Sequence, residues 1–338
     1  FDMSFAHAAK AIDFVFATPS DNIKVEFQGG EPLLNFEVIK WIVCEIEARN
    51  TGLNKNIGFV ITTNLALVND EILAFCKDHD VHISTSLDGP RNLHNMNRPR
   101  PGNNSYELAV AGIERSRLFL GDDRVSAVMT TTRESLSQPE AIIDEYIRLG
   151  FTNIFLRPLS PFGFAVKTKA IEAYSTAEWV EFYKRSIRYI LDLNLQGHDF
   201  CESYSSLILT RILTCFPTGY VDLQSPAGAG ISCLAFNYDG SVYASDEARM
   251  LAEMQDQSFR LGHLDTDTFE DILSSDQLWD FLQQTFTESM PMCSDCGFQP
   301  YCGSDPVFHH ATQGDVVGRK PSSGFCSKNM AIFKYLIG

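Results

Sequence analysis

The sequence predicts an α/β fold in which a parallel sheet or barrel is followed by a separate C-terminal unit. Short β-rich runs alternate with amphipathic helical segments as far as Pro161, and the alternation then stops. Four of the nine cysteines lie within the last 46 residues. Because strands separated by helices favour right-handed βαβ units, we expect the strands before Pro161 to lie parallel in one sheet.

The first helix and strand follow from hydrophobic spacing. Apolar residues recur at helical intervals from Phe5 to Phe16, directly after Ser4, a residue type that caps helix N-termini. The β-rich run Ile23–Phe27 follows and predicts a strand. After Asn35, apolar residues again recur at helical spacing and predict a second helix.

The same alternation predicts four further strands. They are expected at Gly58–Thr62, Val81–Ser86, Arg124–Thr131 and Asn153–Arg157, with helices near residues 68–79, 105–119 and 138–149.

After Pro161 the pattern changes to helices and one hairpin. Ser175 and Glu178 form a capping-box pattern that opens a helix to about Leu195, and another helix is expected near 200–214. Asp239–Gly240 between two short apolar runs predicts a hairpin with a two-residue turn. A helix is expected near 269–286. We divide the chain into residues 1–165, a helical connection at 166–215 and a C-terminal unit at 216–338.

Composition excludes several classes of protein. The 338 residues are 44% hydrophobic and 21% charged, which is ordinary for a globular chain and argues against disordered or fibrous classes. The net charge of −16 argues against general binding to nucleic acids or anionic membranes. No apolar run reaches the roughly 18 to 20 residues of a membrane span, and no signal peptide is visible. The odd number of cysteines favours metal binding over disulfides, and hence the reducing cytoplasm.

The cysteines of the tail are candidate metal ligands. Cys293, Cys296, Cys302 and Cys326 follow spacings that let four thiolates converge on one centre, and the spacing leaves a zinc ribbon and an iron-sulfur cluster open. Cys215 and Cys233 form a Cys-x12-Gly-x4-Cys pattern, which is weak alone because lone cysteines are commonly buried as small hydrophobic residues. Cys44 and Cys76 lie on apolar helix faces and are expected in the core, whereas Cys201 stays undecided.

Polar motifs follow three of the predicted strands. Gly29, Gly30 and Glu31 come directly after the first strand, Thr63–Asn64 after the second and Ser86–Pro90 after the third. Taken alone, the glycine pair also suits a tight strand-to-helix turn. Because parallel strands end at one edge, the three motifs together predict a ligand site there.

These motifs resemble those of a known family. Gly-Gly-Glu-Pro, Thr-Asn and Ser-Leu-Asp-Gly-Pro at successive strand ends resemble the radical S-adenosylmethionine (radical SAM) enzymes. The cysteine pattern of the tail resembles their SPASM extension, which holds auxiliary iron-sulfur clusters in peptide-modifying members. Asp246–Leu251 and Tyr301–Pro306 look most like the His-Xaa-Ser system maturases, the HxsB family. The resemblance implies a partial (β/α)6 barrel without its first strand over residues 1–165 and a SPASM domain over 216–338.

The resemblance also implies roles for individual residues. Gly29, Gly30 and Glu31 would hold the amino group of the SAM methionine, and Asn64 and Ser86 would lie near its ribose and carboxylate. Arg157, with Pro158, would close the side of the sixth strand. The members of the outer auxiliary 4Fe-4S site would be Cys293, Cys296, Cys302 and Cys326, whereas Cys215 and Cys233 would belong to an inner cluster.

Three departures from the family pattern matter. The CxxxCxxC loop that binds the catalytic 4Fe-4S cluster is absent from the printed residues, so we expect it upstream of Phe1 and expect this chain alone to be inactive. Pro306 stands where the family commonly has an inner-cluster cysteine. A further ligand that the family pattern places near Leu209 is also absent. The inner site would need a substitute, keep an open iron or be empty. Leu234 replaces an Asp of sulfatase-maturing relatives and disfavours formylglycine formation.

The candidate substitutes for the inner-cluster cysteine are Asp305, His309, His310 and Cys201.

The implied function is that of a radical SAM oxidoreductase. Such an enzyme cleaves SAM to a 5′-deoxyadenosyl radical and oxidatively modifies or crosslinks side chains of a ribosomally made precursor peptide. Expected partners are that peptide, a flavodoxin or ferredoxin as electron donor and a second, paired radical SAM protein. The alternatives are a non-catalytic peptide-binding scaffold with a zinc ribbon, and a radical SAM enzyme that acts on a small molecule or activates a sulfatase.

Overall fold

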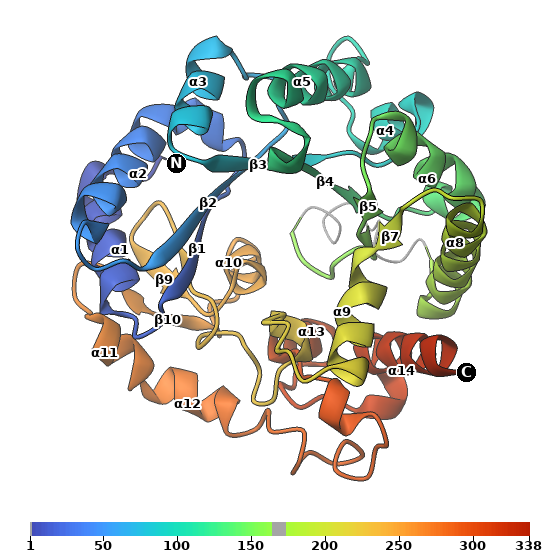
Figure 1. The fold of residues 1–338 in the computed structure, drawn as a ribbon. Coiled ribbons are helices and arrows are strands. Elements are labelled where there is room, and N and C mark those ends of the chain that lie inside the picture. The colour runs from blue at the N-terminus through green and yellow to red at the C-terminus, as the bar shows by residue number, and fades with distance from the viewer. Residues whose placement is uncertain (1, 164–173) are drawn as a thin grey trace. The chain divides into compact units, whose positions relative to one another are not determined.

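The computed structural model describes residues 2–163 and 174–338 (Figure 1). The chain divides into two compact units. The first consists of Phe1–Arg157 with Ser186–Glu202, and the second of Pro158–Arg185 with Ser203–Gly338. Each unit has its own secondary structure and is described separately.

A curled parallel sheet forms the centre of the first unit. Its strand order is β1-β2-β3-β4-β6, and every neighbouring pair is parallel. The strands are β1 (Asn22–Phe27), β2 (Asn56–Thr63), β3 (Val81–Ser86), β4 (Val125–Thr130) and β6 (Leu156–Arg157). In Figure 1 the strands lie inside an arc of helices, as expected for a half-barrel of βα units. The predicted parallel α/β sheet is confirmed.

The helices of the first unit cover the outer side of this sheet. They are α1 (Phe5–Ala17), α2 (Phe36–Asn50), α3 (Asp70–Asp78), α4 (Arg91–Asn97), α5 (Ser105–Leu120) and α6 (Pro139–Arg148). Ser4 caps α1 as predicted, because its hydroxyl accepts the His7 N–H at 3.1 Å. The apolar stripe of α1 turns inward, where Ala8 and Ile12 are buried.

In the first unit, one predicted strand is wrong and one helix was not predicted. The segment Asn153–Arg157 is not one strand, because pairing changes at Phe155: β5 (Asn153–Ile154) pairs with β7 (Cys201–Glu202), and β6 pairs with β4. Glu202 supports the change of partner by accepting the Leu156 N–H at 3.2 Å. The helix α4 was not predicted, since its seven residues include few apolar side chains and carry no clear helical stripe.

Strand register brings the strand ends to one edge of the sheet. Thr63 at the end of β2 is opposite Thr85, Ser86 at the end of β3 is opposite Val128, and Thr130 at the end of β4 is opposite Arg157. The segments that follow these strands therefore start from the same edge, where ligands bind in parallel α/β folds.

The second unit combines helices with a small antiparallel sheet. Its helices are α9 (Ser203–Leu213), α10 (Asp246–Ala252), α11 (Phe269–Leu273), α12 (Asp276–Leu282), α13 (Pro306–Gln313) and α14 (Gly324–Ile337), and α8 (Thr176–Leu195) begins there and ends in the first unit. The sheet order is β10 (Arg260–His263), β9 (Ser241–Tyr243), β8 (Ala235–Phe236). The capping box before α8 is confirmed, with Ser175 Oγ accepting the Glu178 N–H and Glu178 accepting the Ser175 N–H.

Details of the second unit differ from the sequence-based expectations. The hairpin β8–β9 forms, but its turn has three residues, because the Asn237 N–H bonds to the Ser241 carbonyl and the Gly240 N–H to the Asn237 carbonyl. The helix expected at 269–286 is broken into α11 and α12, since Ser275 caps α12 through the Leu278 N–H. The helix expected from residue 200 begins at Ser203, after β7.

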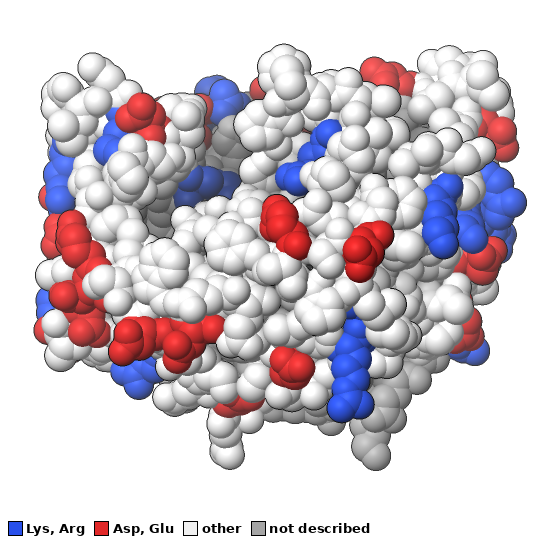
Figure 2. Space-filling model, turned by 90° about the horizontal axis from the view of Figure 1, so that it is seen from below, with Lys and Arg blue, Asp and Glu red and all other residues white. Residues whose placement is uncertain are grey.

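No helix among residues 2–163 and 174–338 is both long and apolar enough to cross a bilayer. On the face drawn in Figure 2, the described Lys and Arg side chains stand apart among acidic and uncharged ones, without a continuous basic band.

Candidate functional site

Glu31 ties together the ends of the first two strands. One carboxylate oxygen accepts the Thr63 hydroxyl at 2.6 Å and the Leu33 N–H at 3.2 Å, and the other accepts the Asn64 N–H at 3.0 Å. Both oxygens are thus used by the protein itself. Glu31 therefore fixes the two turns relative to each other.

The glycine pair before Glu31 faces open space. Gly29 has φ +148°, in the region that favours glycine, and a Cβ on Gly29 or Gly30 would meet no atom within 4 Å. Tight packing within the chain therefore does not explain the two glycines. Exposed backbone at a strand end suits close approach of a ligand.

The other predicted ligand-binding residues lie at the same edge of the sheet. Asn64 is exposed, and its Oδ1 accepts the Ala66 N–H at 2.9 Å. Ser86 is half-buried at the end of β3. Arg157 is exposed, with its guanidinium carbon 5.6 Å from the ring centre of Phe155. Strand register places Asn64, Ser86 and Arg157 at one edge of the sheet. Of these three residues, only Asn64 bonds to Glu31, through its backbone N–H.

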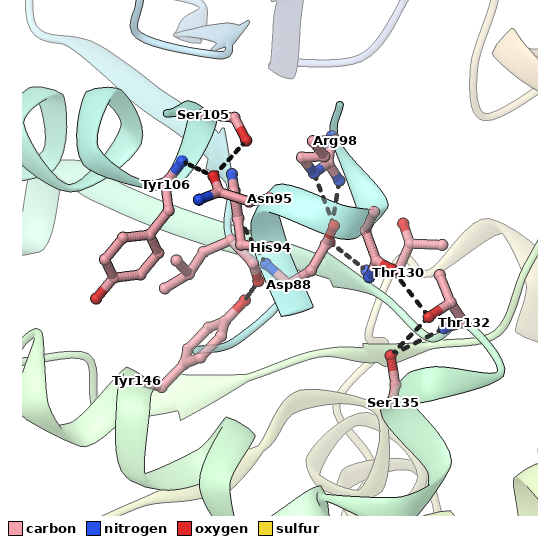
Figure 3. Close-up of polar contacts among 12 residues, drawn as sticks. Asp88, His94, Asn95, Arg98, Ser105, Tyr106, Thr130, Thr132, Ser135 and Tyr146 are labelled. Atoms are coloured by element: carbon pink, nitrogen blue, oxygen red, sulfur yellow. Dashed lines mark hydrogen bonds and ion pairs between the residues drawn. The ribbon is translucent and has the colours of Figure 1, made fainter. Parts of the chain in front are cut away.

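Asp88 clamps the loop after β3 (Figure 3). Its carboxylate accepts Arg98 Nε at 2.8 Å, Arg98 Nη2 at 3.0 Å and the Thr130 N–H at 3.1 Å. The Asp88 side chain is 2% exposed, so this paired and hydrogen-bonded charge is held away from water. Asp88 thereby links the end of β3 to α4 and β4.

Two further bonds complete this clamp. The Asp88 N–H donates to His94 Nδ1 at 3.3 Å, and the Tyr146 hydroxyl donates to the Leu87 carbonyl at 2.7 Å (Figure 3). Burial lowers the pKa of His94, which agrees with a neutral ring that accepts at Nδ1. The Ser-Leu-Asp-Gly-Pro motif therefore acts first as a framework for the strand edge. Arg98 was not predicted, because nothing in its local sequence distinguishes it.

In the second unit, four cysteines surround one pocket. Cys293, Cys296, Cys302 and Cys326 line one pocket together with apolar side chains such as Phe298. Among the described residues, no three His, Cys, Asp or Glu side chains are arranged to hold one metal ion. Four thiols around one pocket are the ligand set of a 4Fe-4S cluster and also of a structural zinc ion.

Local structure positions these cysteines. Cys326 lies in the first turn of α14, where its N–H donates to the N-cap Ser323 at 3.1 Å, and Ser323 is held in turn by His309 Nε2 at 2.8 Å. The Cys296 N–H bonds to the Cys293 carbonyl at 2.9 Å, which closes the turn of the CxxC pair. His309 thus supports the position of one cysteine.

Burial and a nearby cation act in opposite directions on the pKa of the thiols. Burial raises the pKa of Cys293, Cys302 and Cys326, while the ammonium of Lys320 lowers that of Cys293 and Cys326. Lys320 is only 7% exposed, its Nζ donates to the Val317 carbonyl, and burial lowers its pKa. A buried cation beside thiolates offsets the negative charge that cluster ligation creates. Sequence reasoning missed Lys320, since a lone lysine carries no pattern.

The two cysteines predicted for the inner cluster have different surroundings. Cys215 is exposed in a loop, and the Cys233 thiol donates to the Ala244 carbonyl at 3.4 Å. Burial, then the carboxylate of Glu247, raises the pKa of Cys233 to about 11. The carboxylate of Asp222 acts on Cys233 in the same direction, so acidic side chains lie near this thiol.

Of the four candidate substitutes, Asp305 alone lines a pocket beside this region. His309 bonds to Ser323, His310 bonds to Asp256 at 2.8 Å, and Cys201 lies in β7 of the first unit. Asp305 caps α13 by accepting the Phe308 N–H at 2.8 Å.

Comparison with known families locates an iron-sulfur domain in the second unit. Residues 229–297 match the SPASM family, an iron-sulfur cluster-binding domain. The SPASM segment contains Cys233, Cys293 and Cys296, and Cys302 and Cys326 follow it. The prediction of a SPASM domain is confirmed.

Curated relatives cover different shares of the chain. An uncharacterized protein of Methanocaldococcus jannaschii is 40% identical over 88 residues, 26% of this chain and 30% of that protein. One of Methanothermobacter thermautotrophicus is 30% identical over 174 residues, 50% of this chain and 60% of its own length. The chain thus spans well under two thirds of these relatives. The cysteine-type anaerobic sulfatase-maturating enzyme of Clostridium novyi is 20% identical over 344 residues, 95% of this chain and 84% of that enzyme.

Solved structures share the fold. Native anSMEcpe with bound AdoMet and Kp18Cys peptide matches with a TM-score of 0.77 at 17% identity, over 99% of this chain and 89% of that chain. Streptococcus suis SuiB bound to precursor peptide SuiA matches with a TM-score of 0.60 at 14% identity, over 89% of this chain and 65% of that chain. The half-barrel with a SPASM domain is therefore the fold class, as the sequence motifs predicted.

Proposed function

We propose that this chain belongs to a radical SAM/SPASM maturase that oxidatively modifies or crosslinks side chains of a ribosomally made precursor peptide. The observation that carries the proposal is the pocket lined by four cysteines beside a SPASM match. The half-barrel, with open glycine backbone at the ligand-binding edge, supports SAM as the second cofactor.

The residue roles follow from the two sites. Gly29 and Gly30 contact SAM through their backbone, and Glu31 holds the adjoining turns in place. Asn64, Ser86 and Arg157 lie at the same strand edge and contact the rest of SAM. A reduced 4Fe-4S cluster with SAM supplies radical chemistry in this class.

Metal ligation is assigned to the cysteines of the second unit. Cys293, Cys296, Cys302 and Cys326 hold the outer auxiliary cluster. Cys215 and Cys233 are assigned to an inner auxiliary cluster, which needs further ligands besides these two thiolates. In domain terms, we propose a barrel over 1–165, a connection over 166–215 and a SPASM domain over 216–338.

A peptide substrate is supported by similar proteins. Similar solved structures contain bound peptides, among them the SuiB complex with its precursor peptide. Within this class we assign the chain to the HxsB family of His-Xaa-Ser maturases, because the segments Asp246–Leu251 and Tyr301–Pro306 resemble that family. We place the enzyme in the cytoplasm, with a flavodoxin or ferredoxin as electron donor and a paired radical SAM protein as a further partner.

Sulfatase activation is the second candidate, because similar curated proteins include sulfatase-maturating enzymes. Leu234 stands where those relatives are expected to carry a catalytic Asp, which favours a different peptide modification. Co-expression with a short peptide gene from the same gene neighbourhood separates the two. A loss of two hydrogens from that peptide supports maturation, and formylglycine on a sulfatase-derived peptide supports the second candidate.

The cluster assignment is tested by metal analysis of the purified chain under anaerobic conditions. Iron, sulfide and zinc are counted, with Mössbauer spectra on iron-57-enriched protein. We expect about four irons for one outer cluster. Cys296→Ala should lose this iron, whereas Cys76→Ala, at a buried core thiol outside the pocket, should keep it. Equal iron in both variants, or about one zinc without iron, would contradict the assignment.

A further inference from the structure

An asparagine interrupts the apolar inner face of α14. Asn329 is 1% exposed and lies between Phe325 and Phe333, which are buried on the same helix. Asparagine is a poor residue for a helix interior, and a buried amide costs free energy unless its donor and acceptor groups find partners. The partners of Asn329 therefore indicate what the amide does at this position.

One partner is a cysteine of the pocket that is lined by four cysteines. Asn329 lines this pocket too, and its Nδ2 donates to Cys302 Sγ at 3.7 Å. Among the described residues, Cys302 is the one thiol of the four that accepts a side-chain N–H. The amide of Asn329 therefore acts on one chosen sulfur of the pocket.

The other partner determines which end of the amide faces the sulfur. The Tyr204 hydroxyl donates to Asn329 Oδ1 at 2.9 Å, and Tyr204 is 3% exposed. A thiolate can only accept a hydrogen bond, whereas an amide has a donor end and an acceptor end. Because Tyr204 occupies the acceptor end, the donor end points to Cys302.

Tyr204 is held in place by its own surroundings. It lies in the first turn of α9, which packs beside α14 (Figure 1), and its ring centre is 5.8 Å from that of Tyr220 in an edge-to-face arrangement. Further along α9, Arg211 Nη2 donates to the Pro300 carbonyl within the cysteine motif at 3.1 Å. The hydrogen bonds from Tyr204 thus run from α9 through α14 to the pocket.

A hydrogen bond to a ligand sulfur favours the state of a cluster that carries more negative charge. A 4Fe-4S cluster gains one negative charge on reduction, and hydrogen bonds to its sulfurs help to set its reduction potential. The metal-free thiol shows the same direction, because burial raises the pKa of Cys302 and the hydrogen bond from Asn329 lowers it. A donor fixed on Cys302 should therefore make a bound cluster easier to reduce.

We infer that Asn329, oriented by Tyr204, is a positioning residue that donates to the ligand sulfur of Cys302 and raises the reduction potential of the outer auxiliary cluster. The inference rests on the proposed function, because it concerns the cluster that is assigned there to the four cysteines. Asn329 acts on that cluster through Cys302 and is not itself a ligand.

The test is a potentiometric titration of the anaerobically reconstituted chain, followed by electron paramagnetic resonance. The signal of the outer cluster is the one that Cys296→Ala removes. Asn329→Leu keeps the approximate shape of the side chain and removes its N–H donor. We expect about tenfold less reduced cluster at a fixed potential, which is a shift of about 59 mV to lower potential for a one-electron couple.

A second variant leaves the asparagine in place. Tyr204→Phe removes the hydroxyl that orients the amide, and should shift the reduced fraction in the same direction by about threefold. If Asn329→Leu does not retain the cluster, the shift in Tyr204→Phe decides the inference.

The matched control is Tyr183→Phe. It removes another buried tyrosine hydroxyl of the same unit, which is hydrogen-bonded to Ser205 Oγ at 2.6 Å and does not line the cysteine pocket. We expect Tyr183→Phe to lower the melting temperature and to keep the wild-type potential. Wild-type potentials in Asn329→Leu and Tyr204→Phe, even with lowered melting temperatures, would overturn the inference, because the amide would then only join α9 to α14.

Iron and sulfide are counted on the same samples, so that the two proposals can fail separately. Wild-type protein without an iron-sulfur cluster contradicts the proposed function. A wild-type cluster whose potential does not depend on Asn329 or Tyr204 contradicts only the role of Asn329.

Discussion

At the scale of single residues, the thiol ligands and their buried cation form one electrostatic unit. Burial keeps Cys293 and Cys326 protonated to higher pH, and Lys320 acts in the opposite direction. The amount of thiolate available for a cluster therefore depends on one lysine that is nearly hidden from solvent.

Lys320→Met replaces the side chain with an uncharged, unbranched one that is a single atom shorter. We expect the pKa of Cys293 and Cys326 to rise in the metal-free chain, because Lys320 lowers both. Alkylation by iodoacetamide across pH 6 to 10 measures this, with thiols identified by mass spectrometry. The control is Lys334→Met, at an exposed lysine of α14. A pH profile that is the same in both variants would contradict the role of Lys320.

The raised thiol pKa values also set the pH dependence of cluster uptake. Ligation needs thiolates, so binding must release the protons that the buried thiols of Cys293, Cys302 and Cys326 hold at neutral pH. Below the thiol pKa, each unit of pH costs about a factor of ten in affinity per proton released. Reconstitution at pH 6 should therefore be much weaker than at pH 8. Zinc or iron titrations with proton-release measurements check this, and pH-independent affinity would contradict it.

At the scale of elements, short motifs act by joining neighbouring elements. Asp88 connects the loop after β3 with α4 and with the end of β4, and Glu31 connects the turns after β1 and β2. Gly303 has a comparable part in the second unit, since a Cβ there would lie 2.4 Å from the Asp222 carbonyl oxygen. These contacts set the shape of the sites without needing to touch a ligand.

Asp88→Asn should destabilise the first unit by about 2 to 3 kcal/mol, because it leaves Arg98 without its buried charged partner. Urea unfolding monitored by circular dichroism measures the change. The matched control is Asp70→Asn, which breaks the exposed pair with Arg115 and should cost about 0.5 kcal/mol or less. Similar losses in both variants would argue against the clamp.

Gly303→Ala should destabilise the second unit by about 1 to 3 kcal/mol through overpacking, and should lower its iron content. The three atoms nearest to the added Cβ are backbone atoms of residues 222–224, which cannot move aside as a flexible side chain can. Gly297→Ala is the control within the same cysteine motif, because a Cβ there meets nothing within 4 Å. Thermal unfolding and iron analysis of both variants decide the matter; a Gly303→Ala protein with wild-type iron and melting temperature would refute this reasoning.

At the scale of the whole molecule, the two units have separate stabilising elements. The first depends on its parallel sheet, and the second has a small sheet, short helices and loops around the cysteine pocket. Because cluster binding contributes directly to the stability of small metal domains, its effect should be local.

Removal of iron by chelation should therefore loosen the second unit selectively. Hydrogen exchange with mass spectrometry should show lost protection in residues 289–338, with β1–β4 largely unchanged. The strands provide the internal control in the same sample. Equal loss of protection in both units would mean that the cluster stabilises the chain as one body.

The sequence by itself determined the order of elements, the parallel sheet and the cysteine candidates. Side-chain periodicity is a local property, so the apolar stripe of α1 and the β-rich runs could be recognised directly. The three strand-end motifs could be placed at one edge, because parallel connection leaves no other arrangement. The spacing of Cys293, Cys296 and Cys302 is equally local.

Only the tertiary structure decided which distant residues share a site. The break at Phe155 depends on a partner strand at Cys201–Glu202, and the clamp on Asp88 depends on Arg98 and Thr130. Asp222, Glu247 and Asp305 line one pocket although more than 20 residues separate each from the next along the chain. Burial and charge proximity arise from packing in three dimensions, and no spacing along the chain encodes them.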